Sequence, residues 1–435
     1  MFLKNKLTIF SGLLLLLMTF QACSDSSVSV DENVALIQGS VESSGTSEKA
    51  VSNADVSAAT ASAARISSNG SFDIISETET QVDASGNFTL EVDANSLNHI
   101  AVLVETNGEI LKGYLSKSIE NGQSYTIKPV NSVSTAEAVV FADIVAKGKA
   151  DIVHKADIEA VVNQRSATAI RSSSTASGRV AAAVENSADA RVTFFTEYGE
   201  ADAETKMNTW FEIMTEAQAE FESAIRNNSS TEAKEAAFDA LLESKLYAYA
   251  EAGLSEVEVS KLVHMQAKVK NNSLGSASSD IRSDVRASST LLVALAVDKA
   301  TIARAEASGM SQATISAIAD AGAKLTREIR ASVGTDSQIQ AAFETYHEEV
   351  KAAIESDSSV DGSVIVTIDL EINATGGAKY IFDSAIAGIL SLNILNDAYA
   401  EFAGSVRNSV ESRSDLIGSV EADAMADILL LINLF

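Results

Sequence analysis

The stretch Pro129-Val130-Asn131-Ser132-Val133-Ser134-Thr135-Ala136-Glu137 divides the chain, because the spacing of apolar residues changes there. Before Pro129 they alternate with polar residues at the period of a β-strand, and after it they recur about every 3.6 residues, as on one side of an α-helix. Ser134 or Thr135 is suited to cap a helix that starts at Ala136, and Ser134 with Glu137 fits a capping box. The sequence therefore predicts a small N-terminal antiparallel β-sandwich followed by a large, mostly α-helical bundle domain.

On the N-terminal side of this switch, short apolar segments are separated by turn signals. Strands are expected at 35–41, 54–58, 72–75, 88–92, 99–104, 110–115 and 125–127. Asn69-Gly70 and Asn107-Gly108 are dipeptides typical of hairpin turns. About seven strands at even spacing are the pattern of a β-sandwich.

Part of this region resembles a known domain. The resemblance rests on the pieces Ile37-Gln38-Gly39-Ser40-Val41, Val51-Ser52-Asn53-Ala54-Asp55-Val56 and Thr80-Gln81-Val82-Asp83-Ala84-Ser85-Gly86-Asn87-Phe88-Thr89-Leu90. The turn at Gly39, the small Ala54 between sheets and the Asp-x-x-Gly-x-Phe turn at 83–88 resemble the carboxypeptidase regulatory-like (transthyretin-like) domain. The stretch from Ala58 to Thr80 is longer than in that family. The resemblance implies a β-sandwich over 34–130 that acts as a spacer or binding module.

The residues after the switch are predicted to be mostly helical. A helical and Ser-rich connector is expected at 131–177, with the domain boundary in its Ser/Ala/Thr stretch 166–177, and the α-helical domain at 178–435. Helices with narrow apolar stripes are expected at 136–147, 201–227, 231–252, 255–270, after 279, and at 312–333, 336–355 and 379–399. Residues 363–372 are expected to be extended, and 428–435 to form a final docking helix. Such stripes are typical of helices that pack antiparallel in a bundle.

The first residues have the pattern of a secretory signal. Lys4 and Lys6 precede an apolar run at 7–20, which is shorter than the roughly 20 residues of a bilayer-spanning helix. The following Ala22-Cys23 resembles the bacterial lipoprotein processing site, where the signal is cut ahead of Cys and the Cys is acylated. Phe20 stands where such sites usually carry Leu.

This pattern predicts a signal peptide at 1–22, lipidation of Cys23 and a small, polar tether at 23–33. Several acyl chains on one residue give stable anchoring, because each buried CH₂ contributes about 0.8 kcal/mol. Ser24, rather than Asp, follows the Cys, which by resemblance to Gram-negative lipoproteins favours the bacterial outer membrane. The periplasmic and cell-surface faces both stay open, and an ordinary signal peptide ending beside an unmodified Cys23 is the alternative.

Composition restricts the partners. The chain of 435 residues has 60 acidic and 32 basic side chains, a formal net charge of −28. Such a surface repels nucleic acid and anionic lipid, so no nucleic-acid partner is expected. The charge is interpreted as keeping an exposed protein soluble, with a divalent cation or a cationic peptide as the alternative partner.

Metal chemistry has one weak candidate. Glu344 and His347 have the Glu-x-x-His spacing of di-iron bundles, in which both side chains project into the core. Such sites need a second motif and two further Glu, and among the other histidines only His154, with Asp151, approaches the spacing. We therefore expect no metal or cofactor, and a solvated or half-buried His347.

Other catalytic patterns are incomplete or absent from the sequence. Asp357–Gly362 imitates the first half of an EF-hand loop, but Ile368 stands where the bidentate Glu belongs, so an ordinary loop is expected. The sequence has no Gly-x-Ser-x-Gly elbow and no Gly-rich phosphate loop. The stripe of Met207, Trp210 and Met214 is interpreted as core rather than as a ligand groove.

These observations predict a membrane-anchored envelope lipoprotein without enzymatic activity. Its expected role is adhesion, structural support or binding of a protein, peptide or surface polymer, while the lipid fixes its location. The alternatives are a helical-bundle enzyme or metal-binding protein of the periplasm or surface, with Glu344 and His347 as its ligands, and a carrier with a pocket between helices.

Overall fold

The computed structural model describes residues 34–358 except 43–58, 76–78, 94–96, 107, 117, 200–201, 228–229, 255, 276 and 308. The strands are β1 (Ala35–Ser40), β2 (Thr60–Ile66), β3 (Phe72–Ile74), β4 (Thr80–Gln81), β5 (Asn87–Val92), β6 (Ile100–Thr106), β7 (Glu109–Leu115) and β8 (Ser124–Thr126). The helices are α3 (Ser132–Ala146), the short η2 (Ala150–Ile152), α4 (Lys155–Glu159), α5 (Gln164–Ser172), α6 (Ser174–Gly199), α7 (Ala203–Asn227), α8 (Thr231–Glu251), α9 (Glu256–Ser273), α10 (Ser279–Ala307), α11 (Gln312–Ser332) and α12 (Asp336–Glu355).

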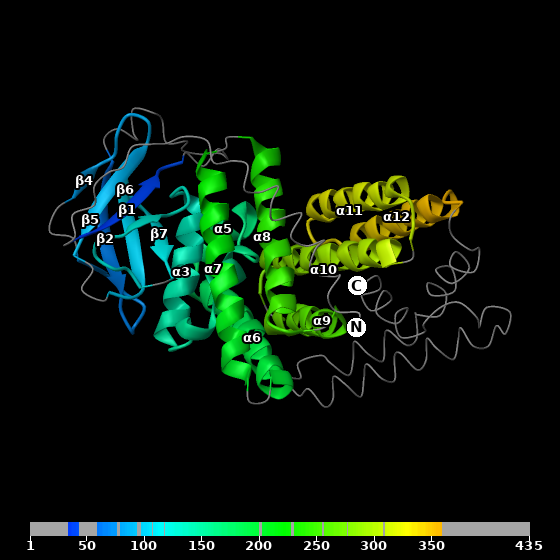
Figure 1. The fold of residues 1–435 in the computed structure, drawn as a ribbon. Coiled ribbons are helices and arrows are strands. Elements are labelled where there is room, and N and C mark those ends of the chain that lie inside the picture. Colours follow the sequence, from blue (N-terminus) through cyan, green and yellow to red (C-terminus); the bar gives the residue numbers. More distant parts are fainter. Residues whose placement is uncertain are drawn as a thin grey trace.

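Several predictions lie outside the described residues. They concern the signal peptide and tether with Cys23, the strand at 54–58, and the segments predicted at 363–372, 379–399 and 428–435. Within the described part, the predicted mixed organisation is confirmed: strands come first and helices follow, as Figure 1 shows.

The strands form two sheets. One has the order β5-β1-β8, and the other has the order β3-β2-β6-β7 with β4 also beside β2. All pairs are antiparallel except β1 with β8, which run parallel. Parallel neighbours need a long connection. Here that connection contains the second sheet, because β2 to β7 lie between β1 and β8 in the chain.

The two sheets share one hydrophobic cluster. Ile37 and Phe88 of the first sheet and Ala63 and Val102 of the second are among its buried members. A Cβ atom at Gly39 would lie 2.4 Å from the Phe88 ring, so only glycine fits where β1 passes this ring.

The opposite face of the second sheet is covered by α3. Leu103 and Tyr114 of that sheet are buried in one cluster with Phe141 of α3, and the Tyr114 and Phe141 rings stack at 4.7 Å. The sheet is therefore buried on both sides, which explains why β6 is apolar at consecutive positions instead of alternating.

The sequence did not predict β2, although β2 lies in the middle of the second sheet. Its residues Thr60–Ile66 are rich in alanine, which has low strand propensity. Ala61, Ala63 and Ala64 are fully buried, so small side chains let the packed layers approach closely here. Tertiary packing therefore overrides local propensity at β2.

The start of α3 differs from the prediction. Asn131 is the N-cap, and its side chain accepts hydrogen bonds from the amides of Val133 and Ser134. The Ser134 hydroxyl accepts the amide of Asn131 and completes the capping box. The predicted pairing of Ser134 with Glu137 is wrong, because Glu137 lies inside the helix and is buried.

Helix α6 links two hydrophobic cores. Its first half contributes Val180 and Val184 to the core with α3 and the second sheet, and its second half contributes Phe194 and Phe195 to the core of the later helices. The Ser/Ala/Thr stretch at 166–177, predicted to hold a boundary, runs through α5 and into α6.

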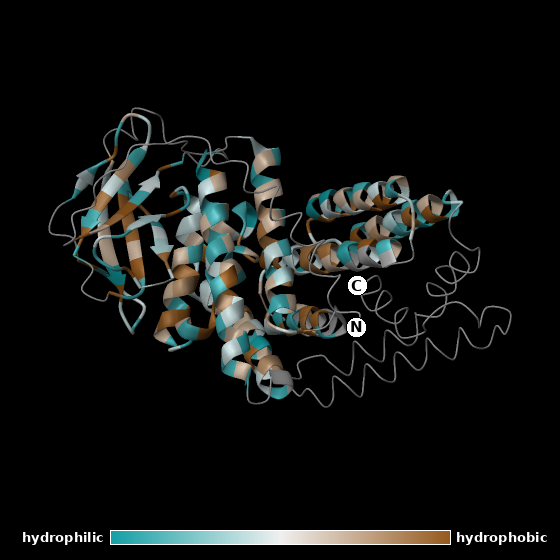
Figure 2. Ribbon diagram, viewed as in Figure 1, coloured by the Kyte–Doolittle hydropathy of each residue, from teal (hydrophilic) through white to brown (hydrophobic). Residues whose placement is uncertain are grey.

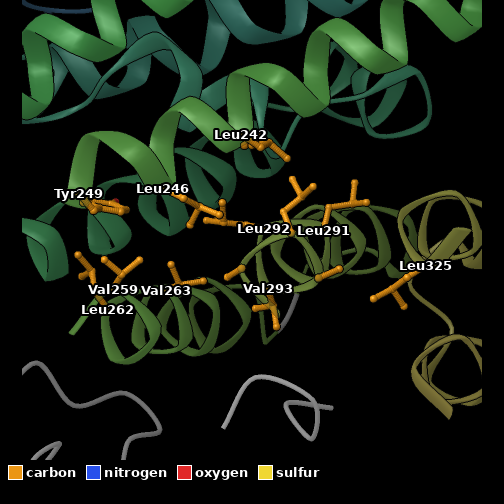
Figure 3. Close-up of a cluster of buried hydrophobic side chains, with 14 of the residues drawn as sticks. Leu242, Leu246, Tyr249, Val259, Leu262, Val263, Leu291, Leu292, Val293 and Leu325 are labelled. Carbon is orange, nitrogen blue, oxygen red and sulfur yellow. The ribbon is translucent and has the colours of Figure 1, made fainter. Parts of the chain in front are cut away.

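The helices run in two groups rather than in one bundle. Figure 1 shows α3 next to the sheets and α7 and α8 farther from them, with α10, α11 and α12 extending crosswise beyond α8. Leu242 and Leu246 of α8, Val263 of α9 and Leu291 and Leu292 of α10 meet where the groups join (Figure 3).

The predicted apolar stripes are largely confirmed. In α12 all members are buried, namely Ile339, Phe343, Tyr346, Val350 and Ile354. Apolar and polar residues interleave along the helices in Figure 2. Among the described residues, no helix combines the length and apolarity that a bilayer crossing requires.

Candidate functional site

A cleft of about 380 Å³ opens where the sheets meet the first helices. Its walls come from the ends of β6, β7 and β8 on one side and from η2, α4 and α7 on the other. The lining residues are His99, Leu115, Ser116, Ser124, Tyr125, Thr126, Ala150, Asp151, Val153, His154, Lys155, Phe211, Thr215, Gln218, Ala219, Glu222 and Ser223. The volume is within the range of small-molecule sites, roughly 300–1,000 Å³.

Lys155 and Glu222 form a buried ion pair in the lining of this cleft. Lys155 lies on α4 and Glu222 on α7, and each side chain is at least nine-tenths buried. The Lys155 ammonium also donates to the carbonyl of Tyr114 at 3.1 Å and lies 4.8 Å from the centre of its ring. Lys155 therefore contacts β7, α4 and α7 at once.

Gln218 extends the polar contacts beneath the cleft. Its Nε2 donates to Glu159 Oε2 at 2.8 Å and to Glu222 Oε1 at 3.2 Å. The Lys128 ammonium lies 3.0 Å from Glu159 Oε1 and also forms an ion pair with Glu137. The amide of Gln218 is therefore held in one orientation, because carboxylates only accept hydrogen bonds.

A second buried carboxylate anchors the other side of α4. Arg191 donates to both oxygens of Asp157, at 2.9 and 2.8 Å, and Lys245 donates to Asp157 Oδ1 at 2.6 Å. Such a bidentate guanidinium–carboxylate pair fixes direction as well as distance. The Arg191 guanidinium lies 3.9 Å from the centre of the Trp210 ring, a cation–π contact.

We call these residues the charged cluster. Its cations are Lys128, Lys155, Arg191 and Lys245, and its carboxylates are Glu137, Asp157, Glu159 and Glu222. The formal charges of these groups balance, and each of them pairs with at least one group of opposite charge. An ion buried without a partner would cost several kcal/mol.

Burial and pairing shift the pKa values in opposite directions. Burial alone would raise the pKa of Asp157, but Arg191 and Lys245 hold it well below the ordinary value. Burial raises the pKa of Glu137 to about 7, although Lys128 opposes the shift. Burial, followed by the charge of Lys245, lowers the pKa of Lys270 to about 7.

The histidines in the cleft are neutral at pH 7. Burial lowers the pKa of His154 to about 4, and its Nδ1 accepts the amide of Ala156, so the ring proton lies on Nε2. Burial also lowers the pKa of His99, although Asp151 opposes the shift. His99 Nδ1 is buried and has no hydrogen-bond partner among the described residues.

The sequence candidates for metal chemistry do not meet in space. Glu344 is exposed, and its carboxylate accepts a hydrogen bond from the side-chain amide of Gln340 on the same helix. His347 is buried, with only 8% of its surface exposed. The expected solvated or half-buried His347 is therefore wrong. Asp151 lines the cleft with His154. No group of three or more potential metal ligands occurs among the described residues.

Asp357, the first residue of the EF-hand-like segment, has a structural contact. Its carboxylate accepts the amide of Ser311 at 2.8 Å and the hydroxyl of Thr314 at 2.7 Å, at the start of α11. The Met207, Trp210 and Met214 stripe packs into the helical core, as predicted.

No family model, curated protein or solved structure matches this chain. The resemblance of residues 34–130 to the carboxypeptidase regulatory-like domain therefore stays a prediction.

Proposed function

We propose that this chain is a lipid-anchored lipoprotein of the bacterial outer membrane with a non-enzymatic binding role. Acylation of Cys23 would attach it, and the small polar residues 23–33 would separate the folded part from the bilayer. The support is the order of Lys4 and Lys6, the apolar run at 7–20 and Ala22-Cys23.

We also interpret the two packed sheets as a β-sandwich of the carboxypeptidase regulatory-like type. The shared hydrophobic cluster of the sheets and the close contact of Gly39 with Phe88 support this interpretation. The sheet on which α3 packs is covered on both faces, so the sandwich would be part of a larger body rather than a free spacer.

The observation that carries the binding role is the cleft between the sheets and α7. Its walls come from both parts of the molecule, and the charged cluster fixes the position of α4 and α7 behind it. A site held in this way is preorganised, because binding does not have to order its walls. The ligand would be a protein, a peptide or a surface polymer.

Replacing Cys23 tests the anchoring. We expect a Cys23→Ser variant to lose metabolic labelling with palmitate and to move from the envelope fraction to the soluble fraction. Ser26→Ala is the matched control, because it alters the same tether without the thiol. A variant that stays in the envelope fraction, with unchanged labelling, would overturn the proposed attachment.

A further inference from the structure

We propose that the cleft between β8 and α7 binds an extended, positively charged polypeptide segment, which pairs with the open edge of β8. This inference rests on the proposed binding role and names the chemistry of the partner. Its support is a free strand edge, a buried donor that faces the cleft, and carboxylates without a countercharge in the same lining.

The wall formed by β8 has unpaired main-chain groups. β8 is the last strand in the order β5-β1-β8, so its pairing within the sheet is with β1 on one side. The carbonyl of Gln123 accepts the amide of Leu36 of β1 at 2.9 Å, so residue 123 points its main chain toward β1. Main-chain groups alternate in direction along a strand, and those of Ser124 and Thr126 therefore point away from β1.

This edge is suited to an extended peptide. The main-chain N–H and C=O groups of Ser124 and Thr126 have no hydrogen-bond partner among the described residues, and both residues line the cleft. A peptide can add to such an edge as a new strand, because its own main chain carries the complementary donors and acceptors at the same spacing. A small ligand lacks this regular repeat.

His154 offers a donor on the helical side of the cleft. Its side chain is 6% exposed and lines the cleft. Nδ1 accepts the amide of Ala156 at 3.1 Å, so the ring proton lies on Nε2, which has no hydrogen-bond partner among the described residues. Unlike the unpartnered Nδ1 of His99, this Nε2 is not enclosed by protein atoms, so it is open to the cleft. A peptide carbonyl would accept its proton.

A second hollow continues the cleft along α7. Phe211 and Thr215 are among the residues that line both, and the hollow adds Glu212 and Glu216. The α7 residues of the combined lining run from 208 to 223, a length of about 22 Å, because a helix rises about 1.5 Å per residue. An extended peptide of about seven residues, at roughly 3.3 Å each, would cover this length.

The combined lining is negatively charged. Asp151, Glu212 and Glu216 have no ion-pair partner among the described residues. Glu212 and Glu216 also lie one turn apart on α7, where like charges repel each other. Lys155 is the only Lys or Arg among the described lining residues, and Glu222 already neutralises it. Lysine or arginine side chains of a peptide would relieve the repulsion, and an anionic partner would be repelled.

Charge alone would also admit a polyamine or a metal ion. The Nε2–H group of His154 needs an acceptor, however, and the ammonium groups of a polyamine only donate. No group of three or more potential metal ligands occurs in the part of the chain that the structure describes. A basic peptide supplies the cations, the carbonyl acceptor and the strand edge together.

Trp210 reports occupancy, because it is the only tryptophan of the chain and its ring lies 5.9 Å from His154 and 5.1 Å from Phe211. We would titrate the full mature chain at physiological ionic strength, where long-range attraction to its surface is largely screened. The main probe is a capped heptapeptide of alternating lysine and valine. The others are the same peptide with every internal amide N-methylated, its glutamate–valine counterpart, spermine and diacetylchitobiose.

We expect a saturable fluorescence change with the lysine–valine peptide. The N-methylated peptide keeps the charges but loses the donors of a strand, and it should bind at least tenfold more weakly. Spermine, which has no acceptor, should also bind at least tenfold more weakly. The glutamate–valine peptide and diacetylchitobiose should not saturate the protein.

Two variants locate the peptide in the cleft. Glu212→Gln with Glu216→Gln removes two exposed charges and should weaken binding at least tenfold. The matched control is Glu344→Gln with Glu348→Gln, which removes two exposed charges one turn apart on α12 and should leave binding unchanged. His154→Asn keeps an acceptor for the cap of α4 but removes Nε2–H, and should weaken binding about fivefold, as expected for one hydrogen bond.

Equal affinity for the N-methylated peptide or for spermine would overturn the inference. So would saturation by the glutamate–valine peptide, no saturation by the lysine–valine peptide, or unchanged binding in both cleft variants. Saturation by diacetylchitobiose alone would also overturn it, but would retain the proposed binding role of the cleft. Peptide binding by a Cys23→Ser protein that stays in the envelope fraction would retain the partner class while the proposed attachment fails.

Discussion

The junction of sheets and first helices differs from the unit of α10, α11 and α12 in how its interior is filled. At the junction, the charged cluster places paired ions between α3, α4, α6, α7 and α8. In the α10–α12 unit the interior is mostly apolar, with Ile318 and Leu325 of α11 among its buried residues. Its buried acid Asp298 has no partner of opposite charge within salt-bridge distance among the described residues.

The two interiors contribute differently to the stability of the fold. Hydrophobic packing stabilises the α10–α12 unit, and apolar side chains of similar volume are interchangeable there at small cost. Paired buried ions add little net stability, but removing one partner is costly, so they make one arrangement strongly preferred. The cleft lies beside the region with the more restricted geometry.

The largest expected effect breaks the junction. Asp157→Asn would leave Arg191 and Lys245 buried without a countercharge, and we expect the free energy of unfolding to fall by about 3–5 kcal/mol. Urea denaturation followed by Trp210 fluorescence measures this loss. Glu349→Gln, which removes a surface partner of Lys324, is the control and should leave the unfolding midpoint unchanged. Equal stability of Asp157→Asn and wild type would contradict the role of the cluster.

A cavity in the α10–α12 unit comes next. Leu325 is 1% exposed, so Leu325→Ala should cost about 2–5 kcal/mol of unfolding free energy. Leu325→Met keeps the volume and should cost less than about 1.5 kcal/mol. If both substitutions cost the same, this interior would be as specific as the junction, and the comparison would fail.

The contributions of Asp298 and of Asp157 to the pH dependence of stability should have opposite signs. Burial raises the pKa of Asp298 from 3.8 to about 7, with Glu243 adding to and Lys299 opposing the shift, so the folded state holds this proton more tightly. Stability from Asp298 is therefore present at acid pH and lost as the pH rises from about 4 to 7. Asp157 is the reverse case: its lowered pKa contributes stability above pH 3.8, which is lost as the pH falls.

Asp298→Asn isolates the first of these two contributions. The pKa shift of Asp298 destabilises the folded state by at most about 4 kcal/mol at pH 8. Asp298→Asn removes this cost, but burying the new amide costs about 1–3 kcal/mol, which reduces the gain in stability. We expect a raised melting temperature at pH 8 and little change at pH 5, measured by circular dichroism. A gain of the same size at both pH values would show that removing the charge is not its cause.

The smallest expected effect concerns the cap of α3. Asn131→Ala removes the acceptor for the Val133 and Ser134 amides and should cost about 0.5–2 kcal/mol. Asn131→Ser keeps an acceptor without placing a second carboxylate beside Glu42, to which the Asn131 amide donates at 3.3 Å, and it should restore most of this stability, which thermal denaturation would detect. An alanine variant as stable as wild type would mean that the helix start does not depend on this cap.

Apolar periodicity allowed much of this fold to be predicted. The stripes of α7, α11 and α12 and the apolar segments of β1, β5 and β7 follow from local spacing, and the structure has them where they were expected. Strand β2 was missed because Thr60–Ile66 owes its conformation to neighbouring layers rather than to its own residues. The crosswise orientation of α10–α12 relative to α7 and α8 could not be predicted, because it depends on packing between helices that are far apart in the sequence.

The candidate site was harder to predict than the fold. Lys155, Asp157 and Glu159 are all buried in α4, yet in the sequence they look like an ordinary polar helix turn. Their partners come from residues up to 88 positions away, as for Lys245 with Asp157. A signal did exist, because Ile158, Val161 and Val162 place these charges in an apolar segment, but it does not indicate which ions pair.

The position of α6 has a practical consequence for cutting this protein into pieces. Because its first half is buried with the second sheet and its second half with α7–α9, a break near 166–177 would strip both fragments of an apolar partner. Neither fragment should then express well alone, and limited proteolysis of the intact chain should leave α6 uncut. Binding studies are therefore best done with the uncut chain.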